Sequence, residues 1–402
     1  MFAIRAATAY DGLRFLSEGA TVLVEADRIV GVEGLHHEPP VGCEVTTYDG
    51  TLLPGLIDTH VHLVADGSMG GLERSPDLSD DELDAVIDAM LLHHAAAGVT
   101  TVRDLGDVGY RTLAARDAQR AGRPRVRCAG PPLTVPDGHC HFLGGAVVGT
   151  EAVVAAVAER AQRGVDVVKV MASGGMLTPN SDIMGVQFSP RELATAVRVT
   201  HDAGLSIVAH AHSLAGVEHA LDAGVDGIEH FTCLTDAGMT TSDDLLARVA
   251  AAGVVVCSTL GTDVTRLPPF DTLPPLIQDL IETLGLTEDG NQRGRDEQVR
   301  RMREHGVAVV TGTDSGVAPS KYHGIAWLAV LQLTDSGYSL EDALATATSY
   351  AARVLGLENV TGRLAPGLAA DLLVTDGDLA GDPTSLSRPA GVWVRGEQVP
   401  SP

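Results

Sequence analysis

Eight short apolar segments alternate with longer segments of helical pattern between residues 52 and 316, and this alternation restricts the possible folds more than any other feature. The apolar segments are rich in Val, Ile, Leu and Ala. A regular succession of strand and helix is typical of parallel βα units. Eight such units favour a closed (β/α)8 barrel over an open doubly wound sheet. The expected strands lie at 52–62, 98–106, 124–134, 164–175, 205–212, 225–231, 253–260 and 306–316.

The two ends of the chain have a different pattern. Residues 1–52 and 366–402 contain short alternating stretches interrupted by Asp and Gly, such as ATVLVEADRIVGVEG, and these indicate β-structure. We expect the two ends to meet in one small β-sandwich domain, with a TIM barrel formed by residues 53–365 inserted between them. The chain is thus predicted to be an α/β protein, and its 402 residues are enough for both domains.

One connection is much longer than the others. Residues 261–297 separate the seventh and eighth expected strands and include RLPPFDTLPPLIQDLIETLG. Loops of this length often cover a binding site, and the active sites of such barrels lie on the loops that follow the strands. Two interpretations stay open, a lid over the site and an insertion that only covers the surface.

Ionisable side chains gather where the expected strands end. His60 and His62 are two residues apart at the end of LLPGLIDTHVH, so both side chains point to the same side of the strand. Catalytic groups of such barrels come from the carboxyl ends of several strands. Six residues of this kind on five strands therefore predict a shared metal site rather than isolated polar groups of the core. The other four are Lys169 in VVKVMASGG, His210 in SIVAHAH, His230 in GIEHF and Asp314 in VAVVTGTDSG.

The segments PGLIDTHVHL, GVDVVKVMASGG, IVAHAHSLAGVEHALDAGVDGIEH, GVAVVTGTDSG and EDALATATSYAARVLGLENVTGRLAPGLAADLLV resemble the amidohydrolase superfamily. The similarity spans nearly the whole chain and points to the binuclear branch of Xaa-Pro dipeptidase and imidazolonepropionase-related proteins. It implies that His60 and His62 bind the more buried of two divalent ions, and that His210 and His230 bind the more exposed one. It further implies that Lys169 bridges both ions as a carbamate formed with carbon dioxide. Asp314 would bind the buried ion and move protons.

The chemistry of lysine agrees with the bridging role that the resemblance implies. An ammonium group cannot bind a cation, but a lysine in an apolar strand has a lowered pKa and becomes a neutral amine. That amine can react with carbon dioxide to give an anionic oxygen ligand. A buried ion pair between Lys169 and an aspartate is the alternative. Nitrogen and oxygen ligands suit zinc, the metal we expect, as well as manganese, cobalt or iron.

Five further residues are candidates for substrate contact at the expected barrel mouth. His139 and His141 lie in PDGHCHFLGG after the third strand, and either could instead support a metal ligand. Lys321, Tyr322 and His323 follow the eighth strand and are candidates for binding a substrate carboxylate. For these three residues an ordinary surface loop is the alternative.

Two more polar residues near the strand ends are expected to have supporting roles. His212 faces the same side of its strand as His210, and we expect it to support a ligand rather than to bind metal. Arg103 is expected to form an ion pair with Asp104 or Asp107 rather than to bind a substrate.

Charge and cysteine content restrict the partners and the compartment. The formal net charge of −25 makes nucleic acid and anionic membranes poor partners. The five cysteines show no paired spacing, which fits a reducing compartment. The sequence has no apolar run long enough to cross a membrane and no signal-peptide pattern at its start. We therefore expect a cytoplasmic homo-oligomer that acts on a small-molecule substrate.

The expected activity is hydrolysis of an amide C–N bond in a small substrate such as a dipeptide or an N-acyl amino acid. A metal-bridging hydroxide would attack the carbonyl, and Asp314 would carry its proton to the leaving amine. The same attack suits a cyclic amide, a lactone, a carbamate or another ester-like substrate, and this alternative stays open. A non-catalytic scaffold of the same fold is a third alternative, although such proteins typically lack metal ligands that this chain has.

Overall fold

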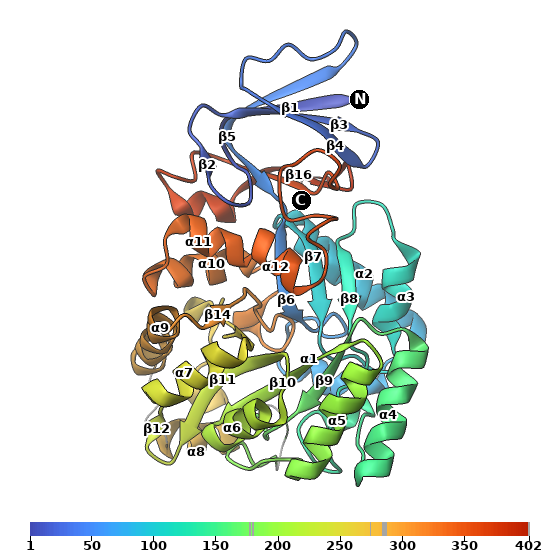
Figure 1. The fold of residues 1–402 in the computed structure, drawn as a ribbon, viewed down its shortest axis with the longest axis vertical. Coiled ribbons are helices and arrows are strands. Elements are labelled where there is room, and N and C mark those ends of the chain that lie inside the picture. Colours follow the sequence, from blue (N-terminus) through green and yellow to red (C-terminus); the bar gives the residue numbers. More distant parts are fainter. Residues whose placement is uncertain (177, 179–180, 274, 284–287, 401–402) are drawn as a thin grey trace.

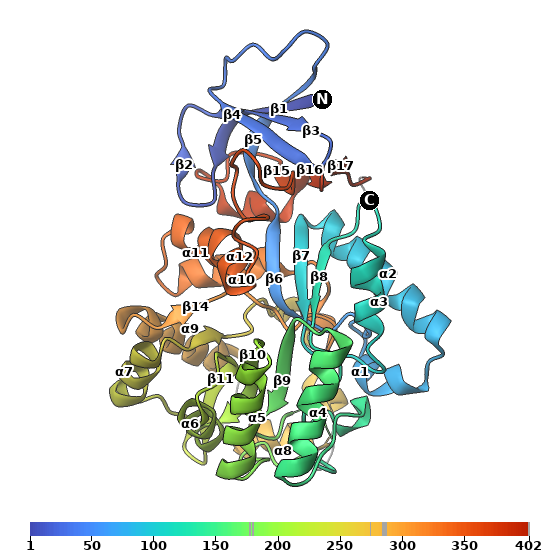
Figure 2. The ribbon, with the colours of Figure 1, turned by 45° about the vertical axis from the view of Figure 1, so that its right-hand side comes forward.

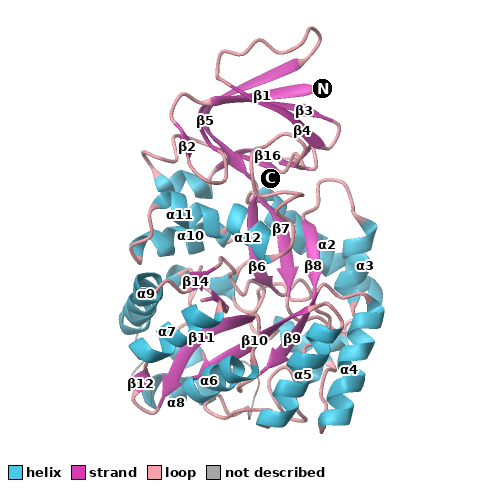
Figure 3. Ribbon diagram, in the orientation of Figure 1, coloured by secondary structure: helices cyan, strands magenta, loops and turns pink. Residues whose placement is uncertain are grey.

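The computed structural model of the chain describes residues 1–176, 178, 181–273, 275–283 and 288–400. It is a mixed α/β structure with two parts (Figure 1). A β-sheet that contains both ends of the chain lies at the top of the view. Below it, a larger part has parallel strands in its interior and helices around them, and Figure 3 shows this separation by secondary structure.

Each of the eight segments predicted to be a strand contains one. These strands form two parallel sheets, of which the first has the order β6-β7-β8 and the second the order β14-β13-β11-β10-β9. The short antiparallel strand β12 (Gly238–Met239) pairs with β11. The parallel strands are β6 (Leu56–Val61), β7 (Val99–Asp104), β8 (Arg125–Cys128), β9 (Val167–Met171), β10 (Ser206–Ser213), β11 (Gly227–Thr235), β13 (Val255–Cys257) and β14 (Ala308–Val309).

Backbone hydrogen bonds connect the two parallel sheets at both edges. The amide of Thr59 in β6 donates to the carbonyl of Thr311 at 3.0 Å, which places β6 beside the segment that follows β14. At the other edge, the amide of Leu133 donates to the carbonyl of Lys169, and the amide of Met171 donates to the carbonyl of Leu133, both at 2.8 Å. The carboxyl ends of strands from both sheets therefore lie near one another.

The helices surround the parallel strands, and α5 and α6 show how the sequence sets their ends. A capping box begins α5, in which Ser189 Oγ accepts from the amide of Glu192 and the Glu192 carboxylate accepts from the amide of Ser189. Gly224, with a φ of 84°, ends α6. The helices are α1 (Gly71–Arg74), α2 (Asp80–Ala96), α3 (Arg111–Ala118), α4 (Thr150–Arg163), α5 (Pro190–Asp202), α6 (Leu214–Ala223), α7 (Asp243–Ala252), α8 (Pro275–Thr283), α9 (Glu288–Glu304), α10 (Ala326–Asp335), α11 (Leu340–Thr346) and α12 (Ser349–Val354).

The strands are buried on both sides, and their two faces differ in chemistry. In β9, Val168 and Val170 belong to the main hydrophobic core. Val167 is on the opposite face, where it packs with Val208 of β10 in a small apolar cluster. Lys169 follows Val167 on that same face because side chains of a strand alternate. The ionisable group thus lies directly beyond an apolar layer in the interior of the strand assembly.

Both ends of the chain contribute to one further sheet, with the order β17-β16-β15-β5-β1-β3-β4 and with β2 paired to β1. We predicted that the two ends form a small β-sandwich domain, and the described strands of both ends pair in a single hydrogen-bonded sheet. It bends around its own core, because Ile29 of β4 and Trp393 of β16 share one apolar cluster although their strands lie at opposite ends of the strand order. The strands are β1 (Phe2–Tyr10), β2 (Phe15–Leu16), β3 (Ala20–Glu25), β4 (Arg28–Glu33), β5 (Glu44–Pro54), β15 (Leu372–Thr375), β16 (Pro389–Val394) and β17 (Glu397–Gln398).

The long connection of residues 261–297 contains α8 and the first turns of α9. Residues 274 and 284–287 of this segment lie outside the described residues, so both interpretations of the segment, a lid over the site and a surface insertion, stay predictions. Among the described residues, no helix is both long and apolar enough to span a bilayer.

Gly50→Ala tests the contact between the two ends of the chain, where β5 pairs with β15. A Cβ atom at position 50 would lie 1.8 Å from the carbonyl oxygen of Thr375, so one of the two strands would have to move. We expect the free energy of unfolding to fall by about 1–3 kcal/mol in a chemical denaturation experiment. Gly34→Ala is the control, because a Cβ there meets nothing within 4 Å. Equal stability of the two variants would contradict the close approach.

Candidate functional site

The structure brings all six predicted metal ligands together at the carboxyl ends of the parallel strands. His60 comes from β6, Lys169 from β9, His210 from β10 and His230 from β11, while His62 directly follows β6 and Asp314 follows β14. The ring centroids of His60 and His230 are 5.4 Å apart, and those of His210 and His230 are 4.5 Å apart. The six positions therefore form one continuous group, although they are spread over more than 250 residues of sequence.

The first part of the group consists of His60, His62 and Asp314. Nε2 of His60 lies 3.2 Å from Oδ1 of Asp314, and Nε2 of His62 lies 3.1 Å from the same oxygen. Burial would raise the pKa of Asp314, but the positive charges and hydrogen bond that the two histidines offer lower it well below its usual value. Three donor atoms thus converge on one small volume, as a cation site requires.

The outer nitrogen of each of these histidines is fixed by an acceptor. Nδ1 of His62 lies 3.1 Å from the carbonyl oxygen of Gly106, and Nδ1 of His60 lies 2.8 Å from Oε2 of Glu229. Because a carbonyl and a carboxylate can only accept, both Nδ1 atoms carry the proton in the neutral ring. Nε2 is then left as a free lone pair that can bind a metal ion.

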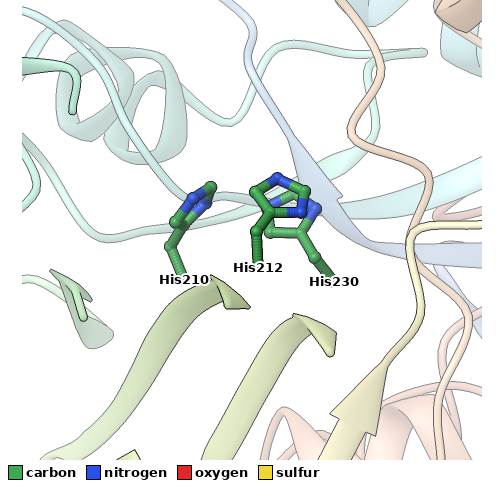
Figure 4. Close-up of side chains that lie close together, drawn as sticks. All are labelled: His210, His212 and His230. Atoms are coloured by element: carbon green, nitrogen blue, oxygen red, sulfur yellow. The ribbon is translucent and has the colours of Figure 1, made fainter. Parts of the chain in front are cut away.

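The second part consists of His210, His212 and His230, which Figure 4 shows close together at the ends of two neighbouring strands. The rings of His212 and His230 stack with centroids 4.4 Å apart. Nε2 of His210 lies 3.1 Å from the carbonyl oxygen of Gly174, so its Nδ1 is the free nitrogen. We expected His212 only to support a ligand, but its position makes it as close to the group as the other two. Strand alternation alone could not distinguish these roles.

Lys169 lies beside both groups and is only 1% exposed. Its Nζ atom has no hydrogen-bond partner among the residues that the structure describes. Burial lowers the pKa of Lys169, and the charge of Lys169 in turn contributes to the lowered pKa values of His60, His210 and His230. The expected alternative, a direct ion pair with an aspartate, is not formed within the described part of the chain. An unpartnered buried amine is costly, and it has the reactivity that carbamate formation needs.

The backbone at two of the candidate ligands has an unusual conformation. His230 has a φ of 70° and Asp314 a φ of 61°, in the left-handed region that non-glycine residues rarely adopt. The guanidinium of Arg295 from α9 donates to the carbonyl oxygen of His230, which holds this turn in place. Such backbone strain tends to occur at functional sites, where the surrounding structure stabilises it.

A buried carboxylate that the sequence analysis did not select supports the first group. Glu229 accepts a hydrogen bond from His60 and is also paired with Arg103, whose Nη2 lies 3.0 Å from Oε1. Burial would raise the pKa of Glu229, but His60 and Arg103 lower it to about 2. The expected pairing of Arg103 with Asp104 or Asp107 is therefore wrong. Glu229 immediately precedes His230 in β11, and both side chains approach the ring of His60. An acidic residue directly beside a candidate ligand is the signal that the sequence contained.

The candidate substrate residues after the eighth strand have internal partners. Nζ of Lys321 donates to the carbonyl oxygens of Thr259 at 2.6 Å and Thr313 at 2.9 Å. Both nitrogens of His323 are engaged, one with the Ala65 carbonyl and one with a ring nitrogen of His94. These contacts use the hydrogen-bonding groups that a substrate carboxylate would need. Tyr322 stacks with Arg266. Substrate contact by these three residues stays a prediction.

His139 and His141, which follow the third expected strand, differ from each other in burial and in their contacts. His139 is buried with its ring 4.4 Å from that of His210, and its Nδ1 lies 2.8 Å from Oγ1 of Thr178. Its place is beside a candidate metal ligand. His141 is half-buried and its Nδ1 donates to the carbonyl oxygen of Gly138. Of the two, His139 is therefore the better candidate for contact with a bound molecule.

The comparisons with known proteins agree with this arrangement. The chain matches the Amidohydrolase family over residues 51–399. It is 28% identical over 359 residues to an uncharacterized protein of Mycobacterium tuberculosis, covering 89% of this chain and 88% of that protein. It is 27% identical over 430 residues to the imidazolonepropionase of Cereibacter sphaeroides, covering 98% and 97%. Its fold is that of the crystal structure of a Xaa-Pro dipeptidase with bound methionine, with a TM-score of 0.86, 24% identity and 99% of each chain covered.

Glu229→Gln tests the buried network of His60, Glu229 and Arg103. The variant keeps the shape of the side chain but leaves the Arg103 guanidinium without its counter-charge in the interior. Breaking a buried pair in this way typically costs about 3–5 kcal/mol, and we expect that loss in the free energy of unfolding. Glu159→Gln, which removes an exposed ion pair with Arg163, should change stability by less than about 1 kcal/mol. A Glu229→Gln variant as stable as this control would rule out the network.

Proposed function

The chain belongs to the amidohydrolase family, and on this basis we propose that it is a metal-dependent hydrolase that cleaves the amide C–N bond of a small substrate, such as a dipeptide or an N-acyl amino acid. One observation carries the proposal. The buried amine of Lys169 has no hydrogen-bond partner among the described residues, and it is near enough to His60, His210 and His230 to lower their pKa values. These histidines belong to two groups of side chains that each suit a divalent ion. We would not expect a non-catalytic scaffold to keep this arrangement, because burying a polar group without a hydrogen bond costs free energy.

We also propose that the two parallel sheets close into one (β/α)8 barrel. The hydrogen bonds at both edges of the sheets and the order of the eight strands support this closure. In this arrangement residues 53–365 form the barrel, and residues 1–52 and 366–402 form the β-domain.

The donor atoms fit two ions. His60, His62 and Asp314 would hold one ion through two Nε2 atoms and a carboxylate oxygen. His210 and His230 would hold the other, with His212 beside them. Lys169, as a carbamate, would supply an oxygen to each. Imidazole nitrogens and carboxylate oxygens suit zinc, which is the metal we propose.

The side chains of the site have separable tasks in the reaction. Divalent ions, when bound, supply a water molecule of lowered pKa and polarise a carbonyl oxygen. Asp314 is placed to accept the proton that this water loses, because its carboxylate stays ionised at neutral pH. It would then donate the proton to the leaving amine, as a general acid. Glu229 holds the ring of His60 in one orientation throughout, and the apolar layer below Lys169 excludes bulk water from that side.

The choice of an amide substrate rests on the family and on the likeness to a dipeptidase. The Xaa-Pro dipeptidase shares the fold over the full length of the chain. A second candidate is a cyclic amide, lactone, carbamate or other ester-like substrate, and the full-length similarity to an imidazolonepropionase keeps it open.

Lys169→Ala tests the two-ion site. We expect metal analysis to find two ions per chain in the wild type and at most one in the variant, with loss of hydrolysis. Short carboxylic acids such as formate should restore part of the activity, because they can replace the missing oxygen ligand. In the wild type, carbon-13 bicarbonate should give a carbamate signal by NMR that the variant lacks.

Val167→Ala is the matched control, because it shortens a buried side chain on the same face of β9 without removing a donor atom. It should keep both ions. Two ions and full activity in Lys169→Ala would refute the bridging role.

Asp314→Asn tests proton transfer, with initial rates measured on a panel of dipeptides and N-acyl amino acids. General acid–base groups typically contribute about 10²–10⁴-fold, so we expect kcat to fall by that factor even when the metal content is restored. Asp335→Asn, at an exposed position at the end of α10, should retain full activity. Hydrolysis of lactones or carbamates alone would favour the second candidate, and turnover unchanged in Asp314→Asn would exclude the proposed role.

A further inference from the structure

A cavity of about 440 Å³ lies at the opposite end of the parallel strands from the histidine groups. Arg125, the first residue of β8, is on its wall, whereas the histidines lie where their strands end. The helices α2 and α3 and the turn between β16 and β17 also surround it. In Figure 2, β17 and the C-terminus lie directly above α2, α3 and β8. The cavity thus lies where the terminal sheet meets the α/β part.

The walls of this cavity are positively charged in a strongly acidic protein. Six arginines and three aspartates line it, so the lining has a net charge of +3 (six minus three), whereas the whole chain has a net charge of −25. A concave surface of one sign concentrates the electric field and attracts ions of the opposite sign. The six are Arg116, Arg120, Arg123, Arg125, Arg127 and Arg395.

Four of these arginines are already paired with carboxylates. Arg123 makes a two-point contact with Asp88, at 2.9 and 2.8 Å, and Arg120 shares the same carboxylate at 3.0 Å. Arg116 and Arg127 share Asp166 in the same way. These pairs build the wall, and they do not by themselves indicate a ligand.

The remaining two arginines have unused positive charge. Nη2 of Arg125 lies 3.7 Å from Oδ2 of Asp371, too far for a hydrogen bond, and Nε of Arg125 is buried without a partner among the described residues. Arg395 donates to the backbone carbonyls of Gln119 and Arg120, which carry no charge. After burial, the nearby charge of Arg125 is the main cause of the lowered pKa of Arg395. The two guanidinium groups thus repel each other, and neither makes a hydrogen-bonded ion pair with a carboxylate among the described residues.

Apolar side chains also line the cavity. Leu91, Val126, Leu357 and Val360 contribute to its lining, next to the guanidinium groups. Ligand sites commonly combine an apolar surface with a few charged groups that fix orientation. Arginine is well suited to planar or tetrahedral anions, because its donors match carboxylate and phosphate oxygens in pairs.

We propose that this cavity binds a small organic anion, whose carboxylate or phosphate group pairs with Arg125 and Arg395 and whose apolar part contacts Leu91 and Val126. The site is separate from the hydrolytic centre, and the proposal does not rest on the proposed function. Because Arg125 belongs to β8 and Arg395 to the terminal sheet, the bound anion joins the two parts of the chain.

Isothermal titration calorimetry with hexanoate and with phenyl phosphate tests the proposal, with benzyl alcohol as a neutral probe of similar size. We expect saturable binding of at least one anion and none of the alcohol. Arg125→Gln and Arg395→Gln should each weaken binding by at least about tenfold. Arg198→Gln, which removes an exposed arginine of α5 paired with Asp202, should leave the affinity unchanged. The stronger of the two anions identifies the preferred group, phosphate or carboxylate.

Two results would overturn the proposal. One is the absence of saturable binding of both anions to the wild type. The other is equal affinity in the wild type and in both glutamine variants, which would place the anion elsewhere, for instance at the histidine groups. If Arg125→Gln does not fold, Arg395→Gln decides alone, because its side chain contacts only backbone carbonyls near the surface.

Discussion

The register between β6 and the segment after β14 determines the geometry of the candidate site. The carboxylate of Asp58 accepts hydrogen bonds from the amide and the hydroxyl of Thr313, at 3.0 and 2.6 Å, and the amide of Asp314 donates to the carbonyl of His60 at 2.8 Å. These bonds join the first and last strands of the series, which are about 250 residues apart in sequence. A one-residue shift of β6 would turn His60 to the other face of its strand and away from Asp314, because strand side chains alternate. The other candidate ligands depend on this contact only indirectly, through their own neighbouring strands.

The site also shows how ionised side chains are stabilised in the buried interior. Glu229 is fully buried but has two positively polarised partners, His60 and Arg103, so both of its oxygens are satisfied. Although Cys257 lies near this carboxylate and His60, the three together are better explained as support than as a further cation site. Lys169 differs from Glu229, since its amine has no hydrogen-bond partner within the described part of the chain. The Glu229 carboxylate thus positions the ring of His60, whereas the Lys169 amine is left available to react or to bind.

Much of this arrangement could be predicted from the sequence, and the limits have physical causes. The alternation of apolar and helical segments located all eight parallel strands, and the change from aliphatic to ionisable residues at their ends selected residues that do converge. The partner of Arg103 could not be predicted, because it depends on how β7 lies relative to β11 across the interior. That the strands of both chain ends pair in one bent sheet could not be predicted, since alternation indicates which residues are buried but not which strands are hydrogen-bonded to one another. The metal roles of the six residues remain predictions.

The chain has only two lysines, the buried Lys169 and the partly buried Lys321, while every other basic side chain that carries a permanent charge is an arginine. Lys169 is buried, and the ammonium group of Lys321 is enclosed by backbone carbonyls. Arginine keeps its charge far into the alkaline range, so the outer surface hardly titrates where lysine-rich proteins lose positive charge. Reagents that modify amines therefore have almost no exposed side chain to react with. A covalent label on a lysine would show directly that the interior had opened.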